Sequence, residues 1–153
     1  MIKIEKATIN DFENINLIAR EVHEQHIQYR PDIFESVEHP IDVERLKLLI
    51  ENNEMLIAKI DDEIIGYIIC NIQLKDHHGL IERKIFFIEQ LAIKQTCHGK
   101  GLGRQIMNSL TELAHKENCT YIELTVSPEN IGAIAFYEKI GMTTRNIKYS
   151  MKI

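Results

Sequence analysis

The chain has 153 residues, of which 44% are hydrophobic, and this is enough for one globular domain, residues 1–153, with a sizeable core. Its formal net charge of −5 disfavours nucleic acid or an anionic membrane as a partner. No run reaches the ~18 apolar residues that a membrane-spanning helix requires, and the alternating N-terminus is unlike a signal peptide. The 3 cysteines are odd in number and widely spaced, which argues against a disulfide framework and favours the reducing cytoplasm.

The first half of the chain predicts three strands and two helices. Residues 2–7 alternate like a strand, and Thr8 or Asn10 can cap the helix that follows. That helix should end before Arg30 and Pro31, because a residue preceding proline avoids the α region. Residues 29–40 read as a loop and residues 55–60 and 64–74 as a β-hairpin. Residues 41–52 predict a second helix, whose inward-facing residues are Val43, Leu46, Leu49 and Ile50.

The second half predicts strands that alternate with helices. Residues 75–80 form an exposed connection, residues 85–93 a buried strand, and residues 102–117 an amphipathic helix. Residues 121–126 form another strand, a further helix follows Asn130 and ends at Gly141, and residues 142–153 close the chain as a strand. This order is α+β, with two β-α-β units in the C-terminal half.

The stretch from His98 to Arg104 lies between the buried strand and its helix and contains glycines at positions 99, 101 and 103. Glycines let backbone amides approach a ligand closely, and the helix directs free amides and its positive dipole end to the same place. Lys100 and Arg104 add cationic side chains, so the stretch predicts a site for an anion, most naturally a phosphate. A Walker loop would need Ser or Thr after Lys100, and a dinucleotide fingerprint would need glycine in place of Arg104. The alternative is a turn that caps a helix and binds nothing.

This stretch resembles the acetyl-CoA pyrophosphate loop of the GNAT acetyltransferases. In that loop an Arg or Gln is followed, after two intervening residues, by Gly and, after one more intervening residue, by Gly or Ala. Gly101 and Gly103 match the glycines, whereas His98 stands at the Arg/Gln position. The segment from Asn130 to Met142 resembles the family's other signature, with Ala, Phe-Tyr-Glu and Gly in place and Met142 where Phe is usual. The resemblance covers residues 86–142 and implies the GNAT fold, an α+β, three-layer arrangement. Its central sheet is mixed, mostly antiparallel, flanked by helices, with splayed fourth and fifth strands.

The resemblance also implies a binding site for acetyl-CoA. The pantetheine arm would lie between the splayed strands and pair with backbone groups of Leu91 and Ile93, while the pyrophosphate would lie on the amides of residues 99–104. Asn130 would form a hydrogen bond beside the pantetheine. The cofactor-binding residues implied in this way are Leu91, Ala92, Ile93, His98, Gly99, Lys100, Gly101, Leu102, Gly103, Arg104, Asn130, Ala133 and Tyr137.

Acetyl transfer to an amine requires an acid and a base. Tyr137 matches the family tyrosine that protonates the departing thiolate, and we expect Phe136 to point to the core and Tyr137 to the cleft. Glu89 is the candidate base, because a lone carboxylate in an apolar strand is costly to bury unless it faces a cleft. Alternation puts Glu89 on the same side of the strand as Leu91, in an apolar neighbourhood that would strengthen it as a base. The alternative for Phe136 and Tyr137 is that both are core aromatics. The alternative for Glu89 is that it faces solvent and has no role.

The predicted function is therefore acetyl transfer from acetyl-CoA to a primary amine by direct attack, with no metal, since no histidine or cysteine set has zinc spacing.

Residues 21–63 hold 12 Asp or Glu and 4 Lys or Arg, a net charge of −8 that leaves a net charge of +3 (−5 minus −8) for the rest of the chain. In this family these residues border the acceptor site, which favours a small cationic amine, and His23 or His26 could line it. The alternatives are a protein N-terminal or lysine acetyltransferase acting on a peptide, and a non-catalytic CoA-binding sensor. A homodimer is common in the family. The carboxylates near the acceptor would be Glu21, Glu24, Asp32, Glu35 and Glu38.

Overall fold

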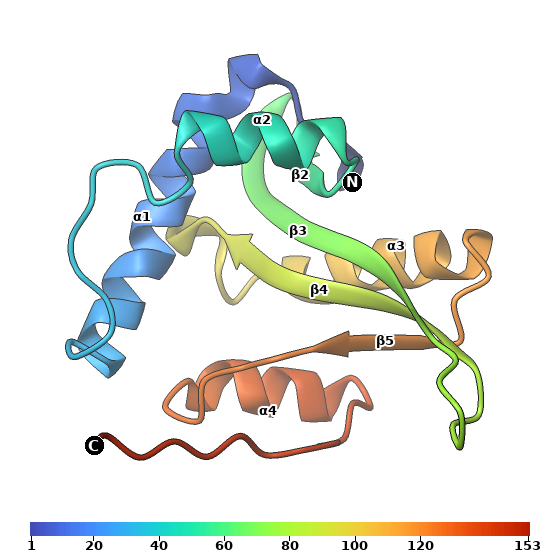
Figure 1. Cartoon of the computed structure of the whole chain (residues 1–153). Coiled ribbons are helices and arrows are strands. Elements are labelled where there is room, and N and C mark those ends of the chain that lie inside the picture. The colour runs from blue at the N-terminus through green and yellow to red at the C-terminus, as the bar shows by residue number, and fades with distance from the viewer.

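The computed structural model describes residues 1–153 as five strands and four α-helices (Figure 1). The strands are β1 (Lys3–Lys6), β2 (Met55–Ile60), β3 (Glu63–Lys75), β4 (Arg83–Ile93) and β5 (Tyr121–Leu124). They form one sheet in the order β1-β2-β3-β4-β5, antiparallel throughout except for the parallel pair β4 and β5. The predicted α+β fold with a mixed, mostly antiparallel sheet is confirmed.

The helices are α1 (Phe12–Tyr29), α2 (Val43–Glu51), α3 (Leu102–Lys116) and α4 (Ile131–Lys139), with short 3-10 turns at Ile9–Asp11 and Gln95–Cys97. The capping prediction at Thr8 is confirmed for the 3-10 turn that leads into α1, where the Asp11 carboxylate accepts hydrogen bonds from both the backbone and the hydroxyl of Thr8. Helix α1 ends before Arg30 and Pro31, as expected. Helix α4 ends at Lys139, and Gly141 follows its C-cap with a φ of 102° that glycine adopts without strain, as expected for a glycine that terminates a helix.

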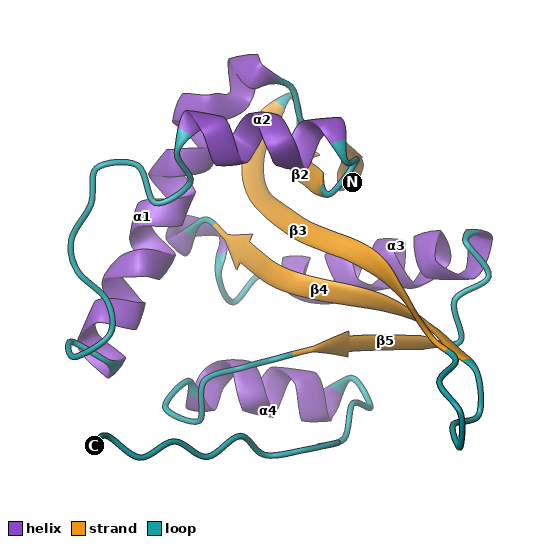
Figure 2. Ribbon diagram, in the orientation of Figure 1, coloured by secondary structure: helices purple, strands orange, loops and turns teal.

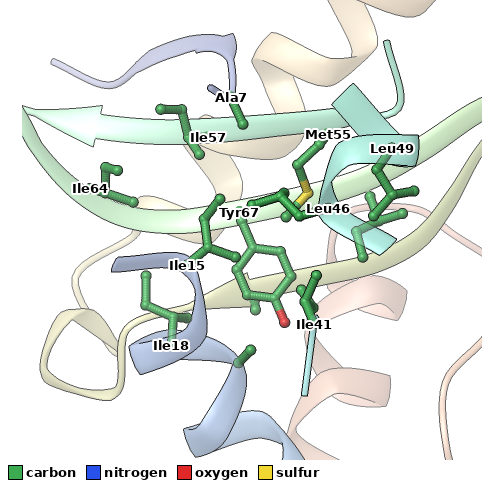
Figure 3. Close-up of a cluster of buried hydrophobic side chains, with 13 residues drawn as sticks. Ala7, Ile15, Ile18, Ile41, Leu46, Leu49, Met55, Ile57, Ile64 and Tyr67 are labelled. Atoms are coloured by element: carbon green, nitrogen blue, oxygen red, sulfur yellow. The ribbon is translucent and has the colours of Figure 1, made fainter. Parts of the chain in front are cut away.

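Two apolar layers hold the helices against the sheet. One lies between the sheet and helices α1 and α2, and Figure 3 shows the Tyr67 ring in it, surrounded by Ile15, Ile18 and Ile41. The other lies between the opposite face and α3, with α4 packed at its edge. In α2 the inward prediction fails only for Val43, which is 40% exposed, because Val43 lies in the first turn beyond the edge of this layer.

The predicted hairpin is present, with Asp61 and Asp62 at positive φ in the two-residue turn between β2 and β3. Strands β3 and β4 approach closely at Gly66, where an added Cβ would lie 2.6 Å from the Ala92 carbonyl oxygen. Glycine is therefore required there by space and not by its backbone angles.

The prediction of a closing strand at residues 142–153 is wrong. No strand forms there, so only one complete β-α-β unit exists, β4-α3-β5 (Figure 2). The physical reason is that alternation makes a segment suitable for a sheet, but a strand forms only when a second backbone pairs with it.

None of the helices combines the length and the apolar composition that a membrane-spanning helix requires.

Candidate acetyl-CoA and acceptor site

Strands β4 and β5 separate part of the way along their length. Their register pairs Ile85 to Ile88 with Tyr121 to Leu124, and beyond Ile88 strand β4 continues to Ile93 with no neighbour on that side. A β-bulge lies at the point of separation, because Ile88 pairs with Cys70 and Gln90 pairs with Ile69, which leaves Glu89 as the extra residue. The predicted splay of the fourth and fifth strands is therefore present, and it exposes one edge of β4.

The exposed edge of β4 presents the backbone of Leu91 and Ile93. The Lys94 amide donates to the Ile65 carbonyl of β3, and because direction alternates along a strand, the groups of Leu91 and Ile93 point away from β3. The ring of His98 donates a hydrogen bond through Nε2 to the Ile93 carbonyl, at 2.8 Å. His98 stands where the family pattern has Arg or Gln, and here its ring fastens the loop of residues 98–104, the glycine loop, to the end of β4.

The loop from His98 to Arg104 presents unpartnered backbone donors. Gly99 and Gly101 have φ angles of 75° and 73°, and α3 begins directly afterwards at Leu102. None of the amides from Gly99 to Arg104 donates a hydrogen bond within the chain. The side chains of Lys100 and Arg104 are exposed and form no ion pair. Free amides, a helix N-terminus and two free cations therefore converge on one place, which suits a phosphate group.

Gly101 and Gly103 are glycines for different reasons. Gly101 needs its positive φ, and an added Cβ there would meet nothing within 4 Å. Gly103 has no such angle, but an added Cβ would lie 3.2 Å from Cζ of Phe136 and 3.5 Å from Cδ1 of Ile93. The second glycine therefore lets the first turn of α3 pack against α4 and the end of β4.

Helix α4 starts at the other wall of the splay. The Asn130 side-chain oxygen caps this helix by accepting from the Ala133 amide at 3.1 Å, and its Nδ2 group has no partner in the chain. Nearby, Glu129 accepts from the Ser127 hydroxyl, which lowers the pKa of Glu129, and the charge of Arg30 acts in the same direction. The end of α1 thus comes close to the turn that precedes α4.

Phe136 and Tyr137 are both half-buried and touch each other edge to face, with ring centroids 5.2 Å apart. The expected division into one core and one cleft residue is therefore wrong, because both rings lie at the edge of the layer beneath α3. The Tyr137 hydroxyl forms no hydrogen bond within the chain, and it is not fully buried. Burial raises the pKa of Tyr137, which keeps the hydroxyl protonated at neutral pH.

Glu89 faces α2 and not the side of Leu91. Its Oε1 forms an ion pair with Nη2 of Arg45, at 2.7 Å, whereas Leu91 packs in the layer beneath α3. The alternation argument is wrong here because the bulge inserts one residue and reverses the side on which Glu89 lies. The expected apolar neighbourhood is also absent, since the Glu89 side chain is 45% exposed. Sequence reasoning missed Arg45, and no motif signals it.

The α1–α2 side of the splay, comprising residues 21–45, has many of its polar groups paired. Glu21 accepts from the Gln95 amide at 2.8 Å, and Asp32 is paired with Arg30 at 2.7 Å. The other three predicted carboxylates, those of Glu24, Glu35 and Glu38, are exposed and have no partner.

His23 and His26 brace the loop after α1. His23 donates through Nε2 to the Glu35 carbonyl at 2.7 Å, and the His26 ring lies 5.1 Å from that of Phe34. Burial lowers the pKa of His26, with a smaller contribution from His23. No group of three His, Cys, Asp or Glu residues in the structure could hold a metal ion.

The comparisons with known proteins agree with this geometry. The family model described as Acetyltransferase (GNAT) family matches residues 15–142. The chain is 32% identical over 85 residues to L-2,4-diaminobutyric acid acetyltransferase of Shouchella clausii, covering 56% of this chain and 44% of that protein. It is 34% identical over 90 residues to aminoglycoside N(6')-acetyltransferase type 1 of Klebsiella pneumoniae, covering 56% of this chain and 45% of that protein. The chain thus spans about half the length of these relatives.

Among solved structures, a tetramutant of the BH1408 protein from Bacillus halodurans superposes with a TM-score of 0.92 at 25% identity, covering 99% of both chains. Ribosomal-protein-alanine N-acetyltransferase of Brucella melitensis gives a TM-score of 0.70 at 14% identity over 100% of this chain and 99% of that one, which supports the fold alone. The match over residues 15–142 carries the assignment, and the splayed strands and glycine loop give it a physical basis. The chain belongs to the GNAT family of acetyltransferases.

Proposed function

We propose that this chain transfers an acetyl group from acetyl-CoA to a primary amine on a small cationic acceptor. The observation that carries the proposal is the set of unpartnered backbone groups on the exposed edge of β4, which include those of Leu91, and around the glycine loop. An extended pantetheine arm can pair with the exposed edge of β4 as an added strand would. Its pyrophosphate would accept hydrogen bonds from amides between Gly99 and Arg104. Leu102 and Ala133 would contribute contact surface, whereas Ala92 is buried and its backbone groups face β3, so its expected role in binding is not supported.

In the proposed reaction the amine nitrogen attacks the thioester carbonyl directly. A C–N bond forms, the resulting tetrahedral oxyanion collapses, and the C–S bond breaks to release CoA. Tyr137 would supply the proton that the thiolate takes up, since its hydroxyl is protonated, unpartnered and reaches the surface. Glu89 would accept the proton lost by the amine, through a water molecule, while Arg45 fixes the orientation of its carboxylate. No covalent enzyme intermediate is required.

The cationic acceptor is favoured by the carboxylates that have no partner on the α1–α2 side. Glu24, Glu35 and Glu38 keep their charge exposed to solvent, so they can attract a second cationic group while the attacking amine is neutral. Glu21 and Asp32 contribute less, because each already has a partner. Relatives named for diaminobutyrate and aminoglycosides also act on molecules with more than one amine.

A peptide acceptor is the second candidate. Ile33 and Val37 are 59% and 43% exposed on the same loop as the unpaired carboxylates of Glu35 and Glu38, and this combination suits a segment with apolar and basic side chains. A protein N-terminus or lysine would then replace the small amine, with the same chemistry at the thioester.

The test is thiol release from acetyl-CoA with a panel containing a diamine, a diamino acid, a basic peptide and a neutral monoamine, at low and high salt. We expect the diamine or diamino acid to react fastest and its rate to fall with added salt, because exposed charges are screened. Preference for the basic peptide would select the second candidate. Tight binding of acetyl-CoA without thiol release for any acceptor would leave the CoA-binding sensor as the function.

A further inference from the structure

The Tyr67 hydroxyl is a buried polar group without a hydrogen-bond partner, and no other buried side-chain polar atom of the chain lacks one. Tyr67 lies in β3 and is 0% exposed, so it has no surface at which an acceptor molecule could contact it. An unpaired hydroxyl in an apolar layer destabilises the folded chain, whereas phenylalanine would fill the same space without that cost. The hydroxyl therefore calls for a partner that reaches it in another state of the site.

The hydroxyl lies near the start of α2. Figure 3 shows it pointing toward Ile41, which comes directly before Asp42, the N-cap of α2. Asp42 accepts a hydrogen bond from the Arg45 amide at 2.9 Å, which fixes Arg45 in the first turn of the helix. Burial raises the pKa of Tyr67, and the charge of Arg45 opposes this rise. The Arg45 guanidinium is therefore close enough to act on the Tyr67 hydroxyl, although no hydrogen bond joins them.

Arg45 has hydrogen-bond donors to spare, whereas the buried polar side chain of this layer does not. Asn16, the one buried residue with an amide or charged side chain, donates both hydrogens of Nδ2 to the carbonyls of Phe12 and Ile41. The guanidinium of Arg45 carries five N–H donors, and its one hydrogen bond runs from Nη2 to Oε1 of Glu89. Arg45 is therefore the side chain that can supply the missing partner.

Tyr67 and Glu89 lie on the same face of the sheet. Tyr67 pairs with Ala92 of β4, and both residues belong to the apolar layer beneath α1 and α2. Glu89 precedes Ala92 in the same strand, and the bulge turns its carboxylate to this face, where it meets Arg45. Arg45 thus has two oxygen groups on one face of the sheet, a carboxylate that it binds and a hydroxyl that it does not.

We propose that Tyr67 is a positioning residue whose hydroxyl is the second partner of Arg45. This inference rests on the proposed function, in which Glu89 takes up, through water, the proton that the amine loses. The carboxylate then becomes a neutral carboxyl and no longer attracts Arg45 by charge. Arg45 keeps its own charge and donates a hydrogen bond to the Tyr67 hydroxyl oxygen instead. Because the guanidinium has a partner in both states, the uptake of the proton by Glu89 leaves no unpaired cation behind.

The first test needs no substrate and uses Glu89→Gln, which keeps the shape of the protonated carboxyl without a charge. A crystal structure of this variant should place a guanidinium nitrogen of Arg45 about 3 Å from the Tyr67 hydroxyl oxygen. Urea unfolding should show the same exchange. Tyr67→Phe in the wild-type background should leave stability unchanged or raised, because the hydroxyl has no partner there. In the Glu89→Gln background it should lower the folding equilibrium constant about tenfold, because it breaks a charge-assisted hydrogen bond.

The second test is kinetic. Tyr67→Phe should lower turnover about threefold to tenfold with the KM for acetyl-CoA unchanged, and it should have no further effect once Arg45 is replaced by Gln. Tyr121→Phe, which removes an exposed hydroxyl of β5, is the control and should keep wild-type turnover.

Two results would overturn the role of Tyr67. One is an Arg45 that stays on residue 89 in the Glu89→Gln structure, including the case in which a water molecule fills the site beside the hydroxyl. The other is a Tyr67→Phe effect on stability or turnover that is the same in both backgrounds. A wild-type chain that releases no thiol with any amine would instead refute the proposed function, and the structure and unfolding of Glu89→Gln would still decide whether Tyr67 receives Arg45.

Discussion

The glycine-loop side of the splay and the α1–α2 side differ in what they leave unpartnered. On the glycine-loop side the free groups are backbone amides, from Gly99 to Arg104, and the exposed edge of β4. On the α1–α2 side the polar groups are side chains, and they are partly engaged with one another, as in the Arg30–Asp32 and Arg45–Glu89 pairs.

This difference explains why a motif could identify one side and not the other. A backbone site depends on glycines and a helix start, which leave a short pattern in the sequence. A site made of side chains depends on which residues the fold brings together, and Arg45 meets Glu89 from 44 positions away. The predictions below test each side separately, beginning with the largest expected effect.

Replacing Tyr137 with Phe removes the proposed proton donor and keeps the ring. We expect turnover to fall by roughly 10²-fold or more, with acetyl-CoA affinity unchanged, because only the transition state uses the proton. Steady-state kinetics and calorimetry on the same sample separate the two quantities. Tyr121→Phe, at an exposed tyrosine of β5, is the matched control. Equal turnover of both variants would remove Tyr137 from the chemistry.

Gly101→Val tests the backbone cradle. A β-branched residue at a φ of 73° carries strain of roughly 1–3 kcal/mol, and we expect the displaced amides to bind acetyl-CoA about 10- to 100-fold more weakly. Lys100→Ala should have a smaller effect, since the amides and the helix dipole remain. Gly79→Val is the control, because Gly79 has a similar φ of 86° in a remote connection and should not change affinity. Unchanged calorimetric affinity in Gly101→Val would refute the placement of the pyrophosphate.

Among the groups that face α2, Glu89→Gln should lower the rate about tenfold or more, because it removes the proposed base. Its acetyl-CoA affinity should stay normal, because Glu89 faces α2 and lies apart from the glycine loop. Arg45→Gln breaks the same ion pair but keeps the carboxylate, so its rate should fall less than that of Glu89→Gln. Equal steady-state rates for the two variants would mean that the ion pair, and not the base, limits the reaction.

The smallest effect is expected from His26, whose pKa is lowered mainly by burial. Below about pH 6.5 the unfolded chain binds a proton more readily than the folded chain, so stability should be retained above that pH and lost as the pH falls. Urea unfolding of wild type and His26→Gln across this range should show a shallower pH dependence in the variant. His77→Gln, at an exposed histidine, should behave like wild type. A variant with the wild-type pH dependence would assign the effect to other groups.

Local chemistry in the sequence determined most of the elements and the glycine-loop side. The hairpin turn, the end of α1 before Pro31, the cap at Thr8 and the helix end at Gly141 follow from the backbone preferences of a few adjacent residues. The strand, glycine turn and helix from β4 to α3 are equally local, so their order and their free amides could be read directly.

Tertiary structure alone decided the features that depend on distant partners. The bulge at Glu89 arises from the register between β3 and β4, and it turns the carboxylate to Arg45 against the alternation of its own strand. His98 acquired its role only when the loop folded back on Ile93, and Gly103 only when Phe136 packed over it. Residues 142–153 show the same limit, because alternation supplies a suitable strand, whereas pairing requires another backbone beside it.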